Sequence, residues 1–148
     1  KKDLQEIYSE EIKPLSKNWK VGDYPLWLYI AFRSKIFFLN ETTGVYRVVE
    51  GSATNQTDLQ KKITFINSIF SMKKYFVTNY NLSYTFTDID DAMNANIGTM
   101  LLLKKERELA KMYFDRINNF NLKHFIKKKI ATYKILSYLY QLNLNNKN

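Results

Sequence analysis

The stretch Trp19 to Trp27, Trp-Lys-Val-Gly-Asp-Tyr-Pro-Leu-Trp, decides how the rest of the chain is interpreted. Pro25 follows Asp23 by two residues. Proline is tolerated in the first turn of a helix because the N–H that it lacks would have no helical partner there. The stretch therefore predicts a helix that starts at Asp23 or Tyr24. Apolar residues continue almost all round this helix to Phe32, which is the pattern of a helix packed inside a domain.

Asp23 has two interpretations at this stage. As the residue that opens a helix, it would accept a backbone N–H and complement the positive end of the helix dipole. Most acidic residues at helix starts do no chemistry, which favours capping when spacing alone is considered. The alternative is a carboxylate that acts on a substrate.

Two runs rich in β-branched and aromatic residues follow this helix, Lys35 to Leu39 and Gly44 to Val49. A turn-like segment at residues 40–43 separates them, so a pair of short strands is predicted. An isolated two-stranded hairpin is marginally stable in water, and these strands therefore need a partner sheet or helix. The predicted fold class is α+β, mostly α.

The remainder of the chain predicts helices at apolar spacings of three and four residues. A short helix is expected over residues 2–12, and three long helices over residues 57–80, 87–117 and 122–140. The first long helix has a capping-box pattern at Thr57 to Gln60. Acidic residues 88, 90 and 91 lie at the start of the second, where they favour a helix N-terminus over a metal-binding Asp-x-Asp motif.

The stretch around Asp23, together with Lys-Ile-Phe-Phe-Leu at 35–39, Val-Tyr-Arg-Val at 45–48 and Ser52, resembles the catalytic domain of bacterial family 2 glycosyltransferases in its second half. The likeness covers Leu15 to about Ser52 well and the helical remainder loosely. It implies that residues 1–55 are the acceptor-side, C-terminal segment of a GT-A type domain that contributes the two strands. Residues 56–148 would then be a three-helix extension.

This resemblance implies catalytic and donor-binding roles for three residues. Asp23 would be the general base that takes the proton of the acceptor hydroxyl. Arg47 would hold the donor diphosphate and Ser52 would add a hydroxyl contact, although a surface arginine on an edge strand is an equally good interpretation. Gly22 stands where the family often has a second acid, and Val49 stands where some relatives have a histidine. No metal ligand is therefore assigned to this segment.

The same resemblance implies an acceptor-binding platform made of Trp19, Tyr24 and Trp27, because aromatic rings stack on the apolar faces of sugars. Core packing is the competing interpretation, favoured for Trp27 and evenly balanced for Trp19. The lone histidine, His124, has no ligand-type neighbour close in sequence and is interpreted as a surface helix residue.

The implied activity is transfer of a hexosyl group from a nucleotide-sugar donor to a glycan or lipid-linked acceptor in cell-surface polysaccharide synthesis. The complete enzyme would use a divalent metal ion, Mg²⁺ or Mn²⁺. The donor pocket and the metal motif would lie upstream of Lys1, so this chain alone is expected to be inactive and to hold no metal. Self-association is left open, and no nucleic-acid partner is expected.

Composition constrains the cellular context. The chain has no cysteine, no leader pattern and no apolar run near the roughly 20 residues that cross a bilayer. A cytoplasmic location is the default. Net charge +9 favours anionic partners. Lys127 to Lys129 are interpreted as a solvated helix face, with peripheral docking at the inner face of the membrane as the alternative. The rival function is a basic helical module that binds nucleic acid or a protein partner.

Overall fold

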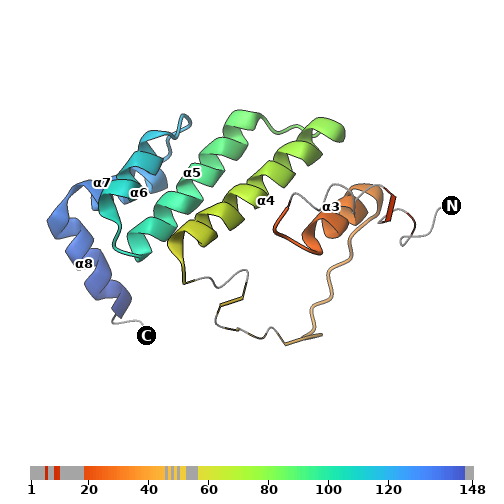
Figure 1. The fold of residues 1–148 in the computed structure, drawn as a ribbon, viewed down its shortest axis with the longest axis horizontal. Helices are drawn as coiled ribbons and strands as arrows, with labels where there is room; N and C mark the ends of the chain where they lie inside the picture. Colours follow the sequence, from red (N-terminus) through yellow and green to blue (C-terminus); the bar gives the residue numbers. More distant parts are fainter. Residues whose placement is uncertain are drawn as a thin grey trace. The chain divides into compact units, whose positions relative to one another are not determined.

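The structure is a computed structural model of the chain, and it describes residues 6, 9–10, 19–45, 47, 49, 51–52 and 57–145 (Figure 1). The chain forms two compact units, Lys1–Leu82 and Ser83–Asn148. The helices are α3 (Tyr24–Arg33) and α4 (Leu59–Asn79) in the first unit, and α5 (Phe86–Leu103), α6 (Arg107–Asp115), α7 (Leu122–Thr132) and α8 (Lys134–Asn145) in the second. None of these helices has both the length and the apolar composition that a membrane-crossing helix needs.

The first unit is held together by an aromatic cluster between α3 and α4. Tyr29 of α3 is buried with Met72 and Phe76 of α4. The ring of Trp19 packs against α4 with its centroid 5.4 Å from that of Tyr75. Aromatic pairs at such distances contribute roughly 0.5–1.5 kcal/mol beyond the area that they bury. Trp19, shortly before α3, is therefore held on α4 by ring packing, and the next backbone N–H, that of Lys20, donates to the Ser68 hydroxyl of α4 at 2.6 Å.

The start of α3 confirms the predicted helix at Tyr24, but the prediction of a helix packed inside a domain is wrong. Only Pro25 and Tyr29 are buried, whereas Trp27 and Phe32 are exposed. The reason is that α3 makes its aromatic contacts on one side. The rings of Tyr29 and Phe32 meet the ring of Tyr80, the residue that ends α4. An apolar surface in the sequence does not guarantee a partner for every face.

The predicted α+β fold is wrong for the part of the chain that the structure describes, because no strand occurs there. Residues 35–45 are neither helix nor strand, and their side chains are exposed, to 83% at Phe37 and 95% at Val45. A strand requires a second backbone as hydrogen-bond partner. Residues 46 and 48 of the second predicted strand lie outside the described residues, as does most of the predicted helix at 2–12.

The predicted three-helix extension is also wrong, since five helices follow residue 56 in the described chain. Helix α4 has nearly its predicted extent, although its N-cap is Asp58 and not Thr57. The second long helix is divided at Lys104 and Lys105, and Lys105 has the left-handed φ of 66°. The third is divided at Tyr133, whose backbone is extended.

The second unit is a chain of neighbouring helices in which α5 packs on α6, α6 on α7, and α7 on α8 (Figure 1). Its closest packing lies between α5 and α6. The ring of Phe114 is fully buried, and a Cβ added at Gly98 would lie 3.0 Å from it. Gly98 therefore does more than weaken the helix locally, because its missing side chain makes room for the Phe114 ring.

Candidate functional site

The residue on which the functional prediction depends, Asp23, occupies the N-cap position of α3, but its side chain caps nothing. One carboxylate oxygen, Oδ2, accepts a long hydrogen bond of 3.3 Å from the indole Nε1 of Trp27. The other oxygen has no hydrogen-bond partner among the described residues. Asp23 is exposed. The simpler of the two sequence interpretations, a carboxylate engaged by a backbone N–H, is therefore not what the structure contains.

Backbone geometry explains why this aspartate does not cap its helix. A capping residue normally has an extended backbone, which directs its side chain toward the N–H groups of the next residues. The three described N-caps that do cap, Asp58, Thr85 and Asn121, have ψ angles of 122°, 158° and 168°. Asp23 is instead helical, with ψ −21°. Pro25 also removes one of the N–H groups that a cap would satisfy.

The three aromatic residues predicted to bind the acceptor are placed differently from one another. Trp27 is 58% exposed and contacts Asp23 through its indole N–H, and Tyr24 is exposed at the same end of α3. Trp19 is half-buried against Tyr75 and Phe76. From the sequence, core packing was favoured for Trp27 and left open for Trp19. In the structure Trp19 is the packed residue and Trp27 the exposed one. The structure groups Asp23, Tyr24 and Trp27 at one helix end and uses Trp19 for packing.

The two predicted donor contacts lie in the segment that follows α3. Arg47 is exposed, and within the described chain no ion pair or hydrogen bond joins it to Asp23. Ser52 is half-buried, and its backbone N–H donates to the carbonyl of Val49 at 3.3 Å. The roles of Arg47 and Ser52 in diphosphate binding stay predictions.

The acidic cluster at the start of α5 has structural partners. Thr85 and Asp88 form a full capping box, in which each side chain accepts a hydrogen bond from the other residue's backbone N–H. Hydrogen bonds from the Thr85 hydroxyl and backbone hold the pKa of Asp88 below its ordinary value of 3.8. The first aspartate of the Asp88-Ile89-Asp90 pattern therefore caps the start of α5.

Asp91 connects α5 to the segment between α6 and α7. It is 5% exposed and accepts the backbone N–H groups of Asn118 at 2.9 Å and Asn119 at 2.7 Å, with the Asn118 side-chain amide at 3.1 Å. Burial alone would raise the pKa of Asp91, but these hydrogen bonds outweigh burial and lower the pKa from 3.8. The sequence pattern did not reveal this connection because its partners lie 27 and 28 residues away.

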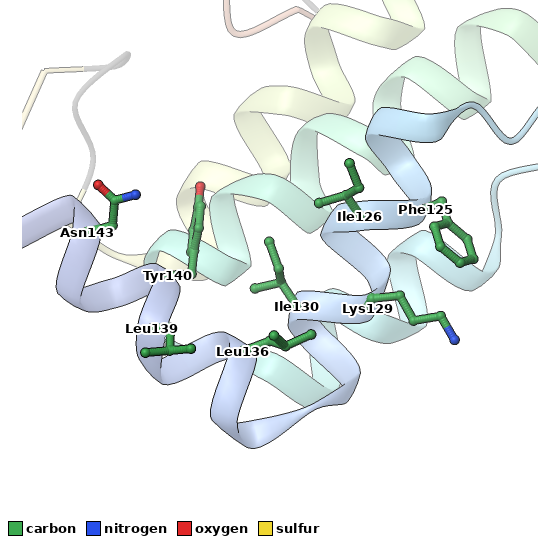
Figure 2. A pocket seen from close by; sticks show the side chains of 8 residues that line it. All are labelled: Phe125, Ile126, Lys129, Ile130, Leu136, Leu139, Tyr140 and Asn143. Carbon is green, nitrogen blue, oxygen red and sulfur yellow. The ribbon is translucent and has the colours of Figure 1, made fainter.

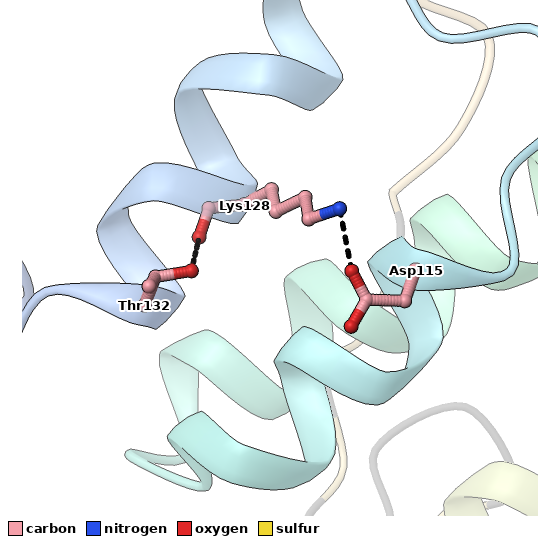
Figure 3. Close-up of polar contacts among 3 residues, drawn as sticks. All are labelled: Asp115, Lys128 and Thr132. Carbon is pink, nitrogen blue, oxygen red and sulfur yellow. Dashed lines mark hydrogen bonds and ion pairs between the residues drawn. The ribbon is translucent and has the colours of Figure 1, made fainter.

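The lysine run of α7, interpreted from the sequence as a solvated face, has three different environments. Lys127 is half-buried and donates to the Thr99 hydroxyl of α5 at 2.8 Å, and burial lowers its pKa, assisted by the charge of Lys123. Lys128 forms an ion pair with Asp115 of α6, shown with the Thr132 hydroxyl bond to the Lys128 carbonyl in Figure 3. Lys128 also lies over the Phe120 ring, and Lys129 lies over the rings of Phe125 and Tyr133.

His124 belongs to the start of α7 and is half-buried, so it is less exposed than predicted. Its backbone N–H donates to the Asn121 cap at 2.9 Å, and its ring meets the Phe120 ring edge-on. No group of three or more metal-ligating side chains is placed to hold an ion within the residues that the structure describes.

A cavity of about 290 Å³ lies beside α8 and has a basic rim. Lys105, Arg107 and Lys134 line it together with residues of α8. Arg107 donates from Nη2 to the carbonyl of Thr132 at 3.0 Å, which connects α6 to the end of α7.

Comparison with protein-family models, with curated proteins and with solved structures found no match for this chain. The arrangement of its own residues is therefore the basis for the functional proposal.

Proposed function

We propose that this chain is the acceptor-side part of a glycosyltransferase that transfers a sugar from a nucleotide-sugar donor to a glycan or lipid-linked acceptor. The observation that carries the proposal is the state of the Asp23 carboxylate. It is exposed at a helix end, it is not engaged in capping, and it lies beside the indole of Trp27. Among the described residues its one hydrogen bond comes from that indole, so the other carboxylate oxygen is available to a substrate.

In the proposed reaction Asp23 is a general base. As the acceptor hydroxyl oxygen attacks the anomeric carbon of the donor sugar, its proton passes to a carboxylate oxygen of Asp23. The bond between that carbon and the diphosphate oxygen breaks, and the nucleoside diphosphate leaves with the bonding electrons. The Trp27 indole N–H holds Oδ2 and so limits the directions in which the carboxylate can turn. Tyr24 and Trp27 offer exposed rings on which an acceptor sugar could stack.

The proposal assigns donor binding mainly to residues outside this chain. Arg47 has the planar donor fork that suits a diphosphate, and it is exposed. In the complete enzyme a divalent metal ion, Mg²⁺ or Mn²⁺, would neutralise charge on the diphosphate. The proposal places the ligands of that ion in the upstream half of the enzyme; among the described residues of this chain no group of acidic or histidine side chains is suited to hold it.

The direct test is Asp23→Asn in a protein that contains this chain joined to its upstream nucleotide-binding half. Sugar transfer should fall by about 100- to 10,000-fold, the usual contribution of a general base. Binding of the nucleotide-sugar should stay within about twofold, because the substitution removes a charge that does not contact the donor. Transfer is measured by release of nucleoside diphosphate, and donor binding by titration calorimetry.

Asp58→Asn is the matched control, because Asp58 is also an aspartate at a helix N-cap and does accept a backbone N–H, that of Lys61 at 2.7 Å. Asn caps a helix about as well as Asp, so this variant removes a charge at a helix start, should keep α4 intact and should leave sugar transfer within about twofold. Full transfer activity in Asp23→Asn would refute the assignment of the base. An equal loss in both variants would show that the effect comes from the helices and not from proton transfer.

A further inference from the structure

The second unit has an apolar groove between its last two helices. Ile126 and Ile130 of α7 face Leu136, Leu139 and Tyr140 of α8 across it, with Phe125, Lys129 and Asn143 at its borders (Figure 2). The groove has a volume of about 460 Å³. Its floor is aliphatic, so a polar or charged occupant would find few hydrogen-bond partners there.

Further large apolar side chains are exposed on the same two helices. Eight large apolar side chains outside the core of the unit are exposed, namely Leu122, Phe125, Ile126, Ile135, Leu136, Tyr138, Leu139 and Leu142. Leu139, in the groove, is 54% exposed. An exposed apolar surface of this kind, lying on neighbouring elements, marks a contact with another apolar phase or molecule.

Charge is distributed unevenly along the chain, and the groove lies in its most basic part. Residues 116–148, here called the acid-free segment, hold seven of the 23 Lys and Arg residues and none of the 14 Asp and Glu residues. The rest of the chain is nearly balanced in charge. The groove is apolar, and the segment that contains it carries positive charge without acids. Such a surface complements a partner with an apolar interior and negative charge at its surface.

The lysines differ in whether they are available to such a surface. Lys127 and Lys128 are engaged with Thr99 and Asp115, within the unit. Lys129 lies at the groove border, with its Nζ 5.3 Å from the Phe125 ring centre and 5.6 Å from that of Tyr133. Lys123 and Lys134 are exposed. Of these three lysines, Lys129 lines the groove itself. Lys123 lies on α7 outside the groove lining, and Lys134 lines the cavity on the other part of α8.

We propose that α7 and α8 form a docking surface for an anionic lipid bilayer, with the groove and its apolar borders inserted at the level of the acyl chains. Lys123, Lys129 and Lys134 then lie at the height of the lipid headgroups, because long lysine side chains keep their charge at the interface while their stems lie along apolar surface. This proposal is independent of the glycosyltransferase proposal, since it uses other residues and predicts binding without any saccharide.

The aliphatic floor distinguishes this occupant from nucleic acid. A nucleic-acid surface would use the lysines, but it would leave Ile126, Ile130 and Leu139 in contact with phosphate and water. A bilayer satisfies both features, because anionic headgroups attract the lysines and acyl chains cover the apolar residues.

The test is sedimentation of the whole chain with lipid vesicles. One set is made of phosphatidylcholine alone and the other contains about 30% phosphatidylglycerol, a fraction that gives a negative surface potential. The bound fraction with anionic vesicles should correspond to an association constant at least about tenfold above that with neutral vesicles. Raising the ionic strength to about 1 M, where screening extends to about 3 Å, should remove most of this difference.

Two pairs of variants locate the surface. Leu139→Asp should weaken association with anionic vesicles by at least about tenfold, since it places a charge where an apolar side chain inserts. Val45→Asp, the same kind of change at an exposed residue of the first unit, should leave it unchanged. Lys129→Gln should weaken association about fivefold. Lys73→Gln is its control, because Lys73 also lies over an aromatic ring, that of Phe70, but in the first unit.

Circular dichroism of each variant establishes that it is folded. If Leu139→Asp loses helix, Ile135→Asp takes its place, because Ile135 is more exposed and its substitution disturbs less packing. The proposal is overturned if the folded chain does not bind anionic vesicles, if it binds neutral vesicles equally well, or if the α8 variant binds like the wild type. Salt-sensitive binding to duplex DNA without vesicle binding would also overturn it, in favour of a nucleic-acid partner.

Discussion

Helices α3 and α5 both begin close to aspartates, yet the two helix starts use them in opposite ways. At α5 the acids are engaged: Asp88 completes a capping box with Thr85, and Asp91 holds two backbone N–H groups of a distant segment. At α3 the carboxylate of Asp23 caps no backbone N–H of its helix, and among the described residues its hydrogen-bond partner is the indole of Trp27. The comparison teaches that an acid at a helix start is a functional candidate when the fold leaves it unused.

The largest expected effect on stability is that of Asp91→Ala. The substitution leaves the N–H groups of Asn118 and Asn119 without their charged acceptor and should lower the free energy of unfolding by about 2–3 kcal/mol. Asp91→Asn keeps the volume and one acceptor oxygen, and should lose about half as much. Urea denaturation followed by circular dichroism measures both. Wild-type stability in Asp91→Ala would mean that the hydrogen bonds of Asp91 do not contribute to the stability of the fold, and the contrast with Asp23 would be lost.

Acid should act on the start of α5 through the same hydrogen bonds. The pKa values of Asp88 and Asp91 are lowered in the folded chain. Their contribution to stability is therefore fully present above the unfolded value of 3.8 and is lost as pH falls through the lower folded-state values. Urea midpoints measured from neutral pH down through this range should fall, and the fall should be smaller in Asp91→Ala. An unchanged acid dependence in that variant would contradict the role of Asp91.

A smaller effect is expected from Thr85→Ala. The hydroxyl of Thr85 accepts the N–H of Asp88 at 3.1 Å, and loss of such a cap costs about 1 kcal/mol. Thr87→Ala is the matched control, because Thr87 lies exposed in the first turn of the same helix and is not its N-cap. It should change the free energy of unfolding by less than about 0.5 kcal/mol. Equal losses in the two variants would rule out a specific capping effect.

The smallest expected effect on stability is that of Asp23→Asn. Because Asp23 makes no capping bond, the free energy of unfolding should change by less than about 0.5 kcal/mol. Asp58→Ala at the start of α4 should cost about 1 kcal/mol by comparison, since its side chain accepts the Lys61 N–H. A loss at Asp23 as large as that at Asp58 would show that its carboxylate supports the helix after all.

The starts of α3 and α4 were predictable from the sequence because their signals are local. Pro25 located the start of α3, and the polar residues before Leu59 located that of α4 to within one residue. Helix ends within the second unit were not predictable in the same way. The apolar spacing continues across the left-handed Lys105 and across Tyr133, so the pattern gave no sign of either break.

The prediction of two strands was wrong for a related reason. Residues 35–39 have strand-like composition, but composition cannot supply the second backbone that a strand requires. The place of Asp23 at the start of α3 was predictable, and the surroundings of the nearby aromatic residues were not. The sequence indicated Asp23, whereas the contrast between a packed Trp19 and an exposed Trp27 depends on which side of α3 meets α4.

The contact between Gly98 and Phe114 restricts how this chain can change over time. A Cβ at position 98 would lie 3.0 Å from the Phe114 ring, so the ring would have to move by a few tenths of an ångström to admit it. A larger residue at 98 is accommodated most easily together with a smaller one at 114. The two positions should therefore covary among descendants of this sequence, and a library that randomises both should recover pairs whose combined size is nearly constant.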